Sequence, residues 1–457
     1  MYIEKIDSPA DVKILSVEQM EILVGEIRQA LLHKLSEHGG HIGPNLGMVE
    51  ATIALHYVFS SPHDKIVYDV SHQSYTHKIL TGRKGAFLNA ADYDKVSGYT
   101  NPQESEHDFF TIGHTSTSVS LACGLVKARD LKGGNENIIA VIGDGSLSGG
   151  EAYEGLSNAG ENGTNMIIVV NDNEMSIAEE HAVALASGIA AGGGKPVYGV
   201  YSSFIQRSYD QLSQDLCINN NPATIVVFMG TIAGMNDETH LGFFDIPLIC
   251  NIPNMVYLAP TCKEEYFAML KWSIHQHEHP VAIRVPGASV VSGNLDFDTD
   301  YSDLNRYKLV QKGEKVAILG LGAFYGLGES VAKLLKEECG VEATLINPRY
   351  ITGLDVEMLE ELKRSHSLVV TLEDGELDGG FGEKIARFYG SSDVKVLNYG
   401  VRKEFADRYI TEELLKANRL TDVQIVKIYV NIGNTDQIIN RKDYSRTLYN
   451  AAIVFFL

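Results

Sequence analysis

The first regular pattern is amphipathic and lies near the start of the chain. Apolar residues recur every three or four positions over residues 16–38, a period typical of a helix with one buried face. Ser16 and Gln19 form a capping-box pattern at its start, and Gly39-Gly40 stops it. A glycine-punctuated segment, 41–47, follows, and a second apolar helix is predicted to end near Phe59.

Short apolar runs alternate with helix-like stretches along most of the remaining chain. They cover residues 138–142, 166–170, 224–229, 255–258, 281–285, 316–319, 343–346, 368–372 and 394–397. Continuous apolar strands between helices are typical of parallel sheets that are covered on both faces. The pattern therefore predicts an α/β architecture, repeated along the chain.

The pattern changes at two places, near residue 178 and across the polar, acidic stretch 294–301. We therefore predict domains over residues 1–177, 178–300 and 301–426. An irregular tail, 427–457, follows, in which no helical period is visible. A chain of 457 residues, at about 150 residues per domain, agrees with three domains.

Composition and charge exclude several classes of protein. The chain has 38 Lys and Arg against 59 Asp and Glu, a net charge of −21, so a nucleic-acid partner is not expected. The five cysteines are scattered and form no C-x-x-C motif, which suits a reduced compartment. No signal peptide is visible and no run approaches about 18 apolar residues. We expect a cytoplasmic protein without a membrane partner.

The strongest chemical signal is a pair of motifs at the ends of two predicted strands. Gly143-Asp144-Gly145-Ser146 follows the run 138–142, and Asn171-Asp172-Asn173 follows the run 166–170. Ligands of α/β sheets bind at the carboxyl ends of strands. Asp144 and Asn173 offer the hard oxygens that suit Mg²⁺, and glycines let backbone N–H groups approach a diphosphate. The alternative to a metal and diphosphate site is that the two motifs are unrelated turns.

With these motifs in place, the chain resembles the 1-deoxy-D-xylulose-5-phosphate synthase family of transketolase-like thiamine diphosphate enzymes. The resemblance extends from about residue 8 to 426. Besides the two motifs above, its matching segments are 45–47, 55–59, 69–73, 77–83, 113–118, 178–183, 201–211 and 252–256. It implies parallel-sheet domains that bind thiamine diphosphate, followed by a transketolase-like C-terminal domain.

The resemblance implies that the cofactors are thiamine diphosphate and Mg²⁺. Asp144 and Asn173 look like the metal ligands, with the carbonyl of Met175 as a third. The implied cofactor contacts are His72, Gly113, His114, Thr115, Gly145, Ser146, Asn173, Glu179 and Phe204.

The same resemblance implies a transferase that condenses pyruvate, with decarboxylation, and glyceraldehyde 3-phosphate to 1-deoxy-D-xylulose 5-phosphate, for isoprenoid and thiamine biosynthesis. Glu179 resembles the glutamate that hydrogen-bonds N1′ of the cofactor's aminopyrimidine, and Phe204 is expected to stack on that ring. His41 and His240 resemble active-site histidines, and Arg207 and Arg284 are candidate substrate contacts. A homodimer is also implied.

Each of these residues also has an ordinary structural interpretation. A glutamate at a helix start is usually only a favourable partner of the helix dipole, which is the alternative for Glu179. Phe204 is also compatible with a plain core position. Arg207 and Arg284 are equally the residue types that form structural ion pairs.

The sequence departs from the family pattern in two ways. Family members are considerably longer, and the missing stretch lies between residues 171–177 and 178–183. Met229 stands where the family has a phosphate-binding arginine, and Asn236 where it has an aspartate. Two alternatives to the condensation therefore stay open: the same chemistry with another aldehyde acceptor, and a non-catalytic remnant of a deletion.

Overall fold

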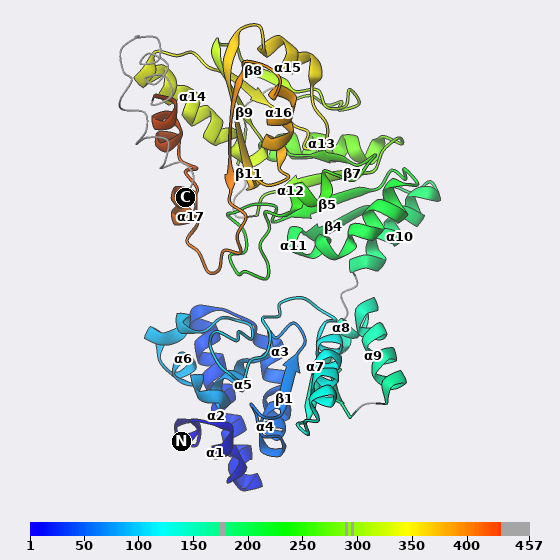
Figure 1. Ribbon diagram of the computed structural model, residues 1–457, viewed down its shortest axis with the longest axis vertical. Coiled ribbons are helices and arrows are strands. Elements are labelled where there is room, and N and C mark those ends of the chain that lie inside the picture. Colours follow the sequence, from blue (N-terminus) through cyan, green and yellow to red (C-terminus); the bar gives the residue numbers. More distant parts are fainter. Residues whose placement is uncertain (164, 173–178, 288–290, 294–296, 431–457) are drawn as a thin grey trace. The chain divides into compact units, whose positions relative to one another are not determined.

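The computed structural model describes residues 1–163, 165–172, 179–287, 291–293 and 297–430, without the side chains of Glu179 and Glu180. The chain divides into two compact units, Met1–Ala178 and Glu179–Leu457. Figure 1 shows that strands and helices alternate in both units. The nine strands predicted from apolar runs are all present, with ends that differ by a few residues. The predicted α/β architecture is therefore confirmed.

The first unit contains a three-stranded parallel sheet in the order β1-β2-β3. Its strands are β1 (Lys65–Tyr68), β2 (Ile138–Gly143) and β3 (Ile167–Asn171). Strand β2 is the central strand and is buried along Ile138–Ile142, as its continuous apolar run predicts. All three carboxyl ends lie at one edge of the sheet, because the strands are parallel.

Helices make up most of the remainder of this unit. They are η1 (Ile3–Lys5), α1 (Pro9–Lys13), α2 (Val17–His38), α3 (Ile42–Gly47), α4 (Val49–Val58), α5 (Tyr75–Lys78), η2 (Ile79–Arg83), α6 (Gly85–Leu88), η3 (Ala90–Lys95), α7 (Ser118–Lys132), α8 (Asp144–Leu147) and α9 (Gly150–Asn162). Helix α2 has the predicted capping box at Ser16 and Gln19. It buries Leu23, Ile27 and Leu31 completely, which are three of the residues in its apolar stripe.

The second unit begins with helix α10 (Glu179–Ala191) and a four-stranded parallel sheet in the order β4-β5-β7-β6. The strands are β4 (Val197–Tyr201), β5 (Thr224–Phe228), β6 (Val256–Leu258) and β7 (Val281–Val285). Between them lie α11 (Ser202–Ile205), η4 (Gln206–Ser208), η5 (Gln211–Cys217), α12 (Asp245–Ile249) and α13 (Lys263–His275).

A five-stranded sheet in the order β12-β11-β9-β10-β8 completes this unit, and only β8 runs antiparallel to its neighbour. Its strands are β8 (Lys308–Gln311), β9 (Lys315–Gly320), β10 (Thr344–Asn347), β11 (His366–Glu376) and β12 (Lys395–Val401). Its helices are η6 (Gly322–Phe324), α14 (Tyr325–Cys339), α15 (Val356–Leu362), α16 (Phe381–Tyr389) and α17 (Thr411–Ala417).

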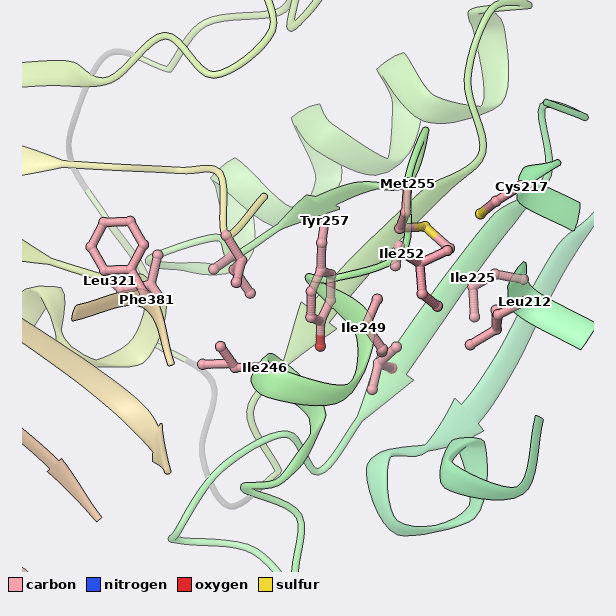
Figure 2. Packing of buried hydrophobic residues seen from close by; sticks show 14 of the residues in the cluster. Leu212, Cys217, Ile225, Ile246, Ile249, Ile252, Met255, Tyr257, Leu321 and Phe381 are labelled. Atoms are coloured by element: carbon pink, nitrogen blue, oxygen red, sulfur yellow. The ribbon is translucent and has the colours of Figure 1, made fainter. Parts of the chain in front are cut away.

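One hydrophobic core joins the two sheets of the second unit. Figure 2 shows Tyr257 of β6 in the middle of this core, between Leu321 and Phe381 on one side and Ile252 and Met255 on the other. The Tyr257 hydroxyl donates to Asp245 within the same core. Burying this aromatic ring between two layers ties them into a single unit.

The single tryptophan of the sequence lies in a smaller cluster, in which residues of α13, β6 and β7 pack with Tyr301 and Tyr350. Trp272 of α13 is 8% exposed. Its ring meets Tyr301 at a centroid distance of 5.9 Å, and its Nε1 donates to Ser302 Oγ at 3.2 Å.

The strands β1, β4 and β8 were not predicted, and each is short or partly exposed. Strand β8 alternates half-buried and exposed residues at a sheet edge, so it lacks a continuous apolar run. The predicted irregular tail is wrong at its start, because a helix spans residues 422–430 and buries Ile425 and Val426 in the core beneath it. Residues 431–457 of the tail lie outside the described residues. Among the described helices, none is long and apolar enough to cross a membrane.

Candidate functional site

Asp69 follows β1 directly and holds the loop 113–118. Its carboxylate is buried; Oδ1 accepts the backbone N–H of Ser116 and Oδ2 that of Ser118, each at 2.8 Å. Ser71 adds a second link, because its Oγ donates to the carbonyl of Ile112 at 2.7 Å. A carboxylate that accepts two backbone bonds fixes a loop firmly, since either N–H would otherwise be buried without a partner.

The loop 113–118 is in turn bonded to the turn after β2. Ser116 has a φ of +73°, and its Oγ donates to the carbonyl of Ser146 at 2.7 Å. Gly149 allows this approach, because a Cβ there would collide with the Ser116 hydroxyl. These bonds bring together two segments that contain five predicted cofactor contacts: Gly113, His114, Thr115, Gly145 and Ser146.

The predicted metal ligands follow β2 and β3, which are neighbouring parallel strands. Asp144 is the first residue of α8 and is half-buried. Gly143 pairs with Asn171 across the two strands, so the strand ends lie side by side. Asn173 and Met175 lie outside the described residues. Within the described part of the chain, no group of three His, Cys, Asp or Glu side chains is arranged to hold a metal ion, and the Mg²⁺ site stays a prediction.

Several buried polar atoms near these loops have no hydrogen-bond partner among the described residues. They are Gln73 Oε1, Ser74 Oγ, Thr117 Oγ1 and Ser118 Oγ. Buried polar groups are normally paired, so such a concentration at the carboxyl end of β1 and the start of α7 suits a polar ligand. Together with the approach allowed by Gly149, the residues present fit a bound diphosphate.

His41 and His72 lie together in the first unit. Their rings meet edge to face at a centroid distance of 5.3 Å. Asn45 fixes the main chain of both residues, because its Nδ2 donates to the carbonyl of His41 and to that of His72, each at 2.7 Å. Tyr75 lies beside them, with its Oη 3.3 Å from Nδ1 of His41.

Phe204 and His240 lie together in the second unit. Phe204 is in α11, directly after the carboxyl end of β4, and His240 lies in the segment between β5 and α12. Their rings also meet edge to face, at a centroid distance of 5.4 Å. Oγ1 of Thr239 contacts His240 Nδ1 at 2.8 Å and Asp237 Oδ1 at 2.5 Å. Burial acts to raise the pKa of Asp237, but hydrogen bonds from His240 and Thr239 hold that pKa below its usual range.

The two predicted substrate arginines have different surroundings. Arg207 is half-buried in η4, three residues after Phe204. Arg284 at the end of β7 is only 3% exposed. Its Nε and Nη2 donate to Asp245 at 2.7 and 3.1 Å, and Nη2 also donates to the carbonyl of Asp374. The geometry thus gives Arg284 an internal ion pair, and its substrate contact stays a prediction, as does that of Arg207.

Glu179 is the first residue of α10, and its side chain lies outside the described residues. The stacking of Phe204 on a cofactor and the catalytic role of Glu179 therefore stay predictions. The structure confirms no ligand contact of any candidate. It does bring candidates together within each unit, His41 with His72 in the first and Phe204 with His240 in the second.

Sequence reasoning did not assign a role to four residues that organise these groups: Asn45, Asp69, Tyr75 and Thr239. Asn45 and Asp69 stand inside the matched segments 45–47 and 69–73, so a signal was present. Their function is to hold backbone atoms of loops that are 27 to 49 residues away in the chain, and such partners are not visible in a local pattern.

Comparison with known proteins gives consistent results over nearly the whole chain. The family model described as 1-deoxy-D-xylulose-5-phosphate synthase matches residues 3–216. The model of the transketolase pyrimidine-binding domain matches residues 170–290, and that of the transketolase C-terminal domain matches residues 305–425.

Two bacterial proteins named 1-deoxy-D-xylulose-5-phosphate synthase illustrate the similarity. The protein from Symbiobacterium thermophilum is 30% identical, over 89% of this chain and 91% of its own length. The protein from Pelotomaculum thermopropionicum is 29% identical, over 93% and 96%. The first alignment spans 593 positions, 136 more than the 457 residues of the whole chain. At least that many positions of the relative have no counterpart here; that they form one missing stretch between residues 171–177 and 178–183 stays a prediction.

Among solved structures, a chain titled "Split gene transketolase, inactive beta4 tetramer" is 21% identical and has a TM-score of 0.49. The match covers 68% of this chain and 96% of that one.

Proposed function

The chain belongs to the 1-deoxy-D-xylulose-5-phosphate synthase family, and we propose on this basis that it condenses pyruvate and glyceraldehyde 3-phosphate to 1-deoxy-D-xylulose 5-phosphate with release of CO₂. The homologues are transketolase-type transferases. The proposed cofactors are thiamine diphosphate and Mg²⁺, and the proposed roles are isoprenoid and thiamine biosynthesis. The predicted homodimer, cytoplasmic location and division into domains at residues 177 and 300 stay predictions.

The observation that carries this proposal is the set of bonds around Ser116. Asp69 holds the Ser116 N–H at 2.8 Å and the Ser116 hydroxyl holds the Ser146 carbonyl at 2.7 Å. Two loops from different parts of the sequence are thereby fixed at the carboxyl edge of one parallel sheet, where α/β sheets bind their ligands. The hydroxyls of Thr117 and Ser118 beside them have no hydrogen-bond partner in the described part of the chain, which favours a polar ligand there.

Each candidate residue of the first unit would contribute to binding thiamine diphosphate or Mg²⁺. Asp144, with Asn173 and the carbonyl of Met175, would hold Mg²⁺ against the diphosphate. Gly145 and Ser146 would bind diphosphate oxygens, with His72 and the segment 113–115 as further contacts. When bound, thiamine diphosphate supplies stabilisation of a carbanion, which the decarboxylation of a 2-oxo acid requires.

The remaining candidates would hold protons and orient groups. Glu179 would hold a proton at N1′ of the aminopyrimidine, and Phe204 would pack against that ring. His41 and His240 would donate or accept protons at substrate oxygens, a role for which neutral imidazoles are well suited. Arg284 is the proposed partner of the acceptor phosphate, and Arg207 is a further proposed substrate contact.

Isothermal titration of thiamine diphosphate into the purified chain, with and without Mg²⁺, tests the binding half of the proposal. We expect binding that requires Mg²⁺ and that is lost in Asp144→Ala. Asp94→Ala is the matched control, because the Asp94 side chain is 92% exposed and pairs with the exposed His38. Absence of binding by folded protein would instead favour a non-catalytic remnant.

Product analysis tests the chemical half. Pyruvate with glyceraldehyde 3-phosphate should give 1-deoxy-D-xylulose 5-phosphate and CO₂, and Glu179→Ala should abolish turnover while much of the cofactor affinity is kept. A panel of plain and phosphorylated aldehydes distinguishes the proposed acceptor from others. Faster turnover with an unphosphorylated aldehyde would contradict the proposed acceptor while keeping the chemistry.

A further inference from the structure

The four-stranded sheet of the second unit has an open edge along β4. Thr224 of the neighbouring strand β5 donates its backbone N–H to the carbonyl of Pro196 at 3.1 Å. Backbone groups of successive strand residues face opposite sides, so Val197, Gly199 and Tyr201 direct theirs away from the sheet. The carbonyl of Tyr201 begins helix α11 as its N-cap. The other five outward groups, three N–H and two C=O, have no hydrogen-bond partner in the part of the chain that the structure describes.

The side chains along this edge are apolar and exposed. Val197 is 48% exposed, Tyr201 is 39% exposed, and Phe228, which pairs with Tyr201 across the two strands, is 37% exposed. Gly199 leaves room for the Phe228 ring, because a Cβ there would lie 2.9 Å from one of its carbons. The ring therefore lies over the backbone of Gly199, on the same face as Val197 and Tyr201. The open backbone edge is thus flanked by an exposed apolar surface.

Two other outer strands of this unit, β6 and β8, are protected where β4 is not. The edge of β6 is covered, because Ile351 donates its N–H to the carbonyl of Tyr257 at 2.7 Å and Ala259 donates to that of Arg349 at 2.8 Å. Strand β8 begins with the charged Lys308. Strand β4 contains no proline and no charged residue, and its register with β5 has no bulge. An edge without such protection is available to pair with another strand.

Charge and symmetry favour a second copy of this chain as the partner. With a net charge of −21, two copies repel each other over most of their surfaces. Over residues 188–206, however, Lys195 is the only charged residue, so two copies can meet at this edge without like charges opposite each other. The outward residues Val197 and Tyr201 are placed symmetrically about Gly199. An antiparallel pair centred on Gly199 therefore aligns outward groups with outward groups in both copies, the isologous arrangement of a twofold dimer.

We propose that the open edge of β4 is an interface between two copies of this chain, paired antiparallel around a twofold axis at Gly199. In this arrangement, Gly199 of each copy donates its N–H to the Gly199 carbonyl of the other, and Tyr201 donates to the Val197 carbonyl. The side chain of Val197 then lies opposite that of Tyr201 in the other copy, a β-branched and aromatic pair of the kind that stabilises sheets. The two four-stranded sheets become one continuous sheet. This dimer does not depend on the proposed function.

Sedimentation velocity of the full chain over a range of concentrations tests the association. We expect a monomer–dimer equilibrium. Val197→Lys places a charged side chain on the edge and should raise the dimer dissociation constant about ten-fold. Ile218→Lys adds the same charge at a position that is 67% exposed and outside the sheet, and should leave the constant unchanged. A chain that stays monomeric over the whole range, or equal effects of the two variants, would overturn the proposal.

Cysteine cross-linking tests the register of the pair. In a hydrogen-bonded antiparallel pair the two Cα atoms lie about 5.5 Å apart, within reach of a disulfide. A mixture of Val197→Cys and Tyr201→Cys chains should therefore give a cross-linked dimer on oxidation. Either variant alone should not, because its two new cysteines would lie about 14 Å apart, and the unmodified protein controls for the five native cysteines. A cross-link in either variant alone, or none in the mixture of folded chains, would contradict the pairing around Gly199.

Discussion

The two units stabilise their strand-end loops with buried charges of different kinds. In the first unit, Asp69 is a lone carboxylate whose partners are the neutral backbone N–H groups of Ser116 and Ser118. In the second, Arg284 lies under the turn after β5 and is paired with a full opposite charge on Asp245. The first arrangement fixes a backbone shape, and the second joins two layers through the carbonyl of Asp374. The two arrangements should therefore fail in different ways when a charge is removed.

The largest effect is expected where a charge loses its counter-ion. Arg284→Met leaves Asp245 buried without a cation and should lower the free energy of unfolding by about 3–5 kcal/mol. Urea denaturation measures this loss. The double variant Arg284→Met, Asp245→Leu removes both charges and should be more stable than the single variant. A double variant that is less stable than the single one would mean that the ion pair is not the relevant interaction.

A smaller loss is expected at Asp69, accompanied by a loss of binding. Asp69→Asn places an NH₂ group opposite one of the two N–H donors, which should cost about 1–3 kcal/mol and weaken thiamine diphosphate binding. Asp64→Asn is the matched control, because buried Asp64 precedes β1 and accepts the backbone N–H of Ser60 and of Asn137 at 2.7 and 2.8 Å. Calorimetric titration should separate the two variants. Equal cofactor affinity in both would contradict a role of Asp69 in shaping the site.

The second unit should also respond to pH through a buried acid. Burial raises the pKa of Glu373 to about 7, against hydrogen bonds from the N–H groups of Gly382 and Phe381 that lower it. The folded state thus binds more protons than the unfolded state between about pH 4.5 and 7. The contribution of Glu373 to stability is full below this interval and falls as pH rises through it.

Urea denaturation of the protein and of Glu373→Gln at pH 5 and pH 8 measures this contribution. The stability of the unmodified protein relative to the variant should fall between the two pH values. Glu383→Gln, at an exposed position in the nearby helix α16, should show no such change. A constant difference between Glu373→Gln and the unmodified protein would exclude the predicted proton uptake.

The smallest effect is expected for a single neutral hydrogen bond in the first unit. Ser116→Ala removes the bond to the Ser146 carbonyl and should lower the free energy of unfolding by about 1 kcal/mol. Ser118→Ala removes a buried hydroxyl that has no partner among the described residues, so in the absence of cofactor its stability should be nearly unchanged. A larger loss in Ser118→Ala than in Ser116→Ala would reverse the interpretation of this loop.

The apolar runs predicted most of the sheet structure because burial on both faces leaves a continuous signal. Strand β7 has the predicted bounds, 281–285. Strand β8 was missed because its residues are alternately half-buried and exposed. The helix at 422–430 was missed because its apolar residues fill a core that is formed by distant strands, and local periodicity carries no information about that core.

The candidate site, like the sheet structure, was predicted for most of its residues but not for all. The resemblance pointed to His41, His72, Phe204 and His240 one by one, and the structure brings the rings of His41 and His72 together, and likewise those of Phe204 and His240. It did not point to Tyr75 or Thr239, whose contacts with the two histidines are visible only in the structure. Arg284 illustrates the opposite case, because this candidate substrate arginine donates to Asp245 and to the carbonyl of Asp374 inside the protein.

The single tryptophan makes the two units separable by spectroscopy. Trp272 is the chain's only tryptophan and is buried in a core of the second unit, so tryptophan emission monitors that unit alone. Far-ultraviolet circular dichroism, by contrast, detects helices in both units. Two transitions that do not coincide would mean that each unit melts with its own midpoint. Arg284→Met would then shift the fluorescence transition. Asp69→Asn would shift only the dichroism transition of the first unit, on which the single tryptophan does not report.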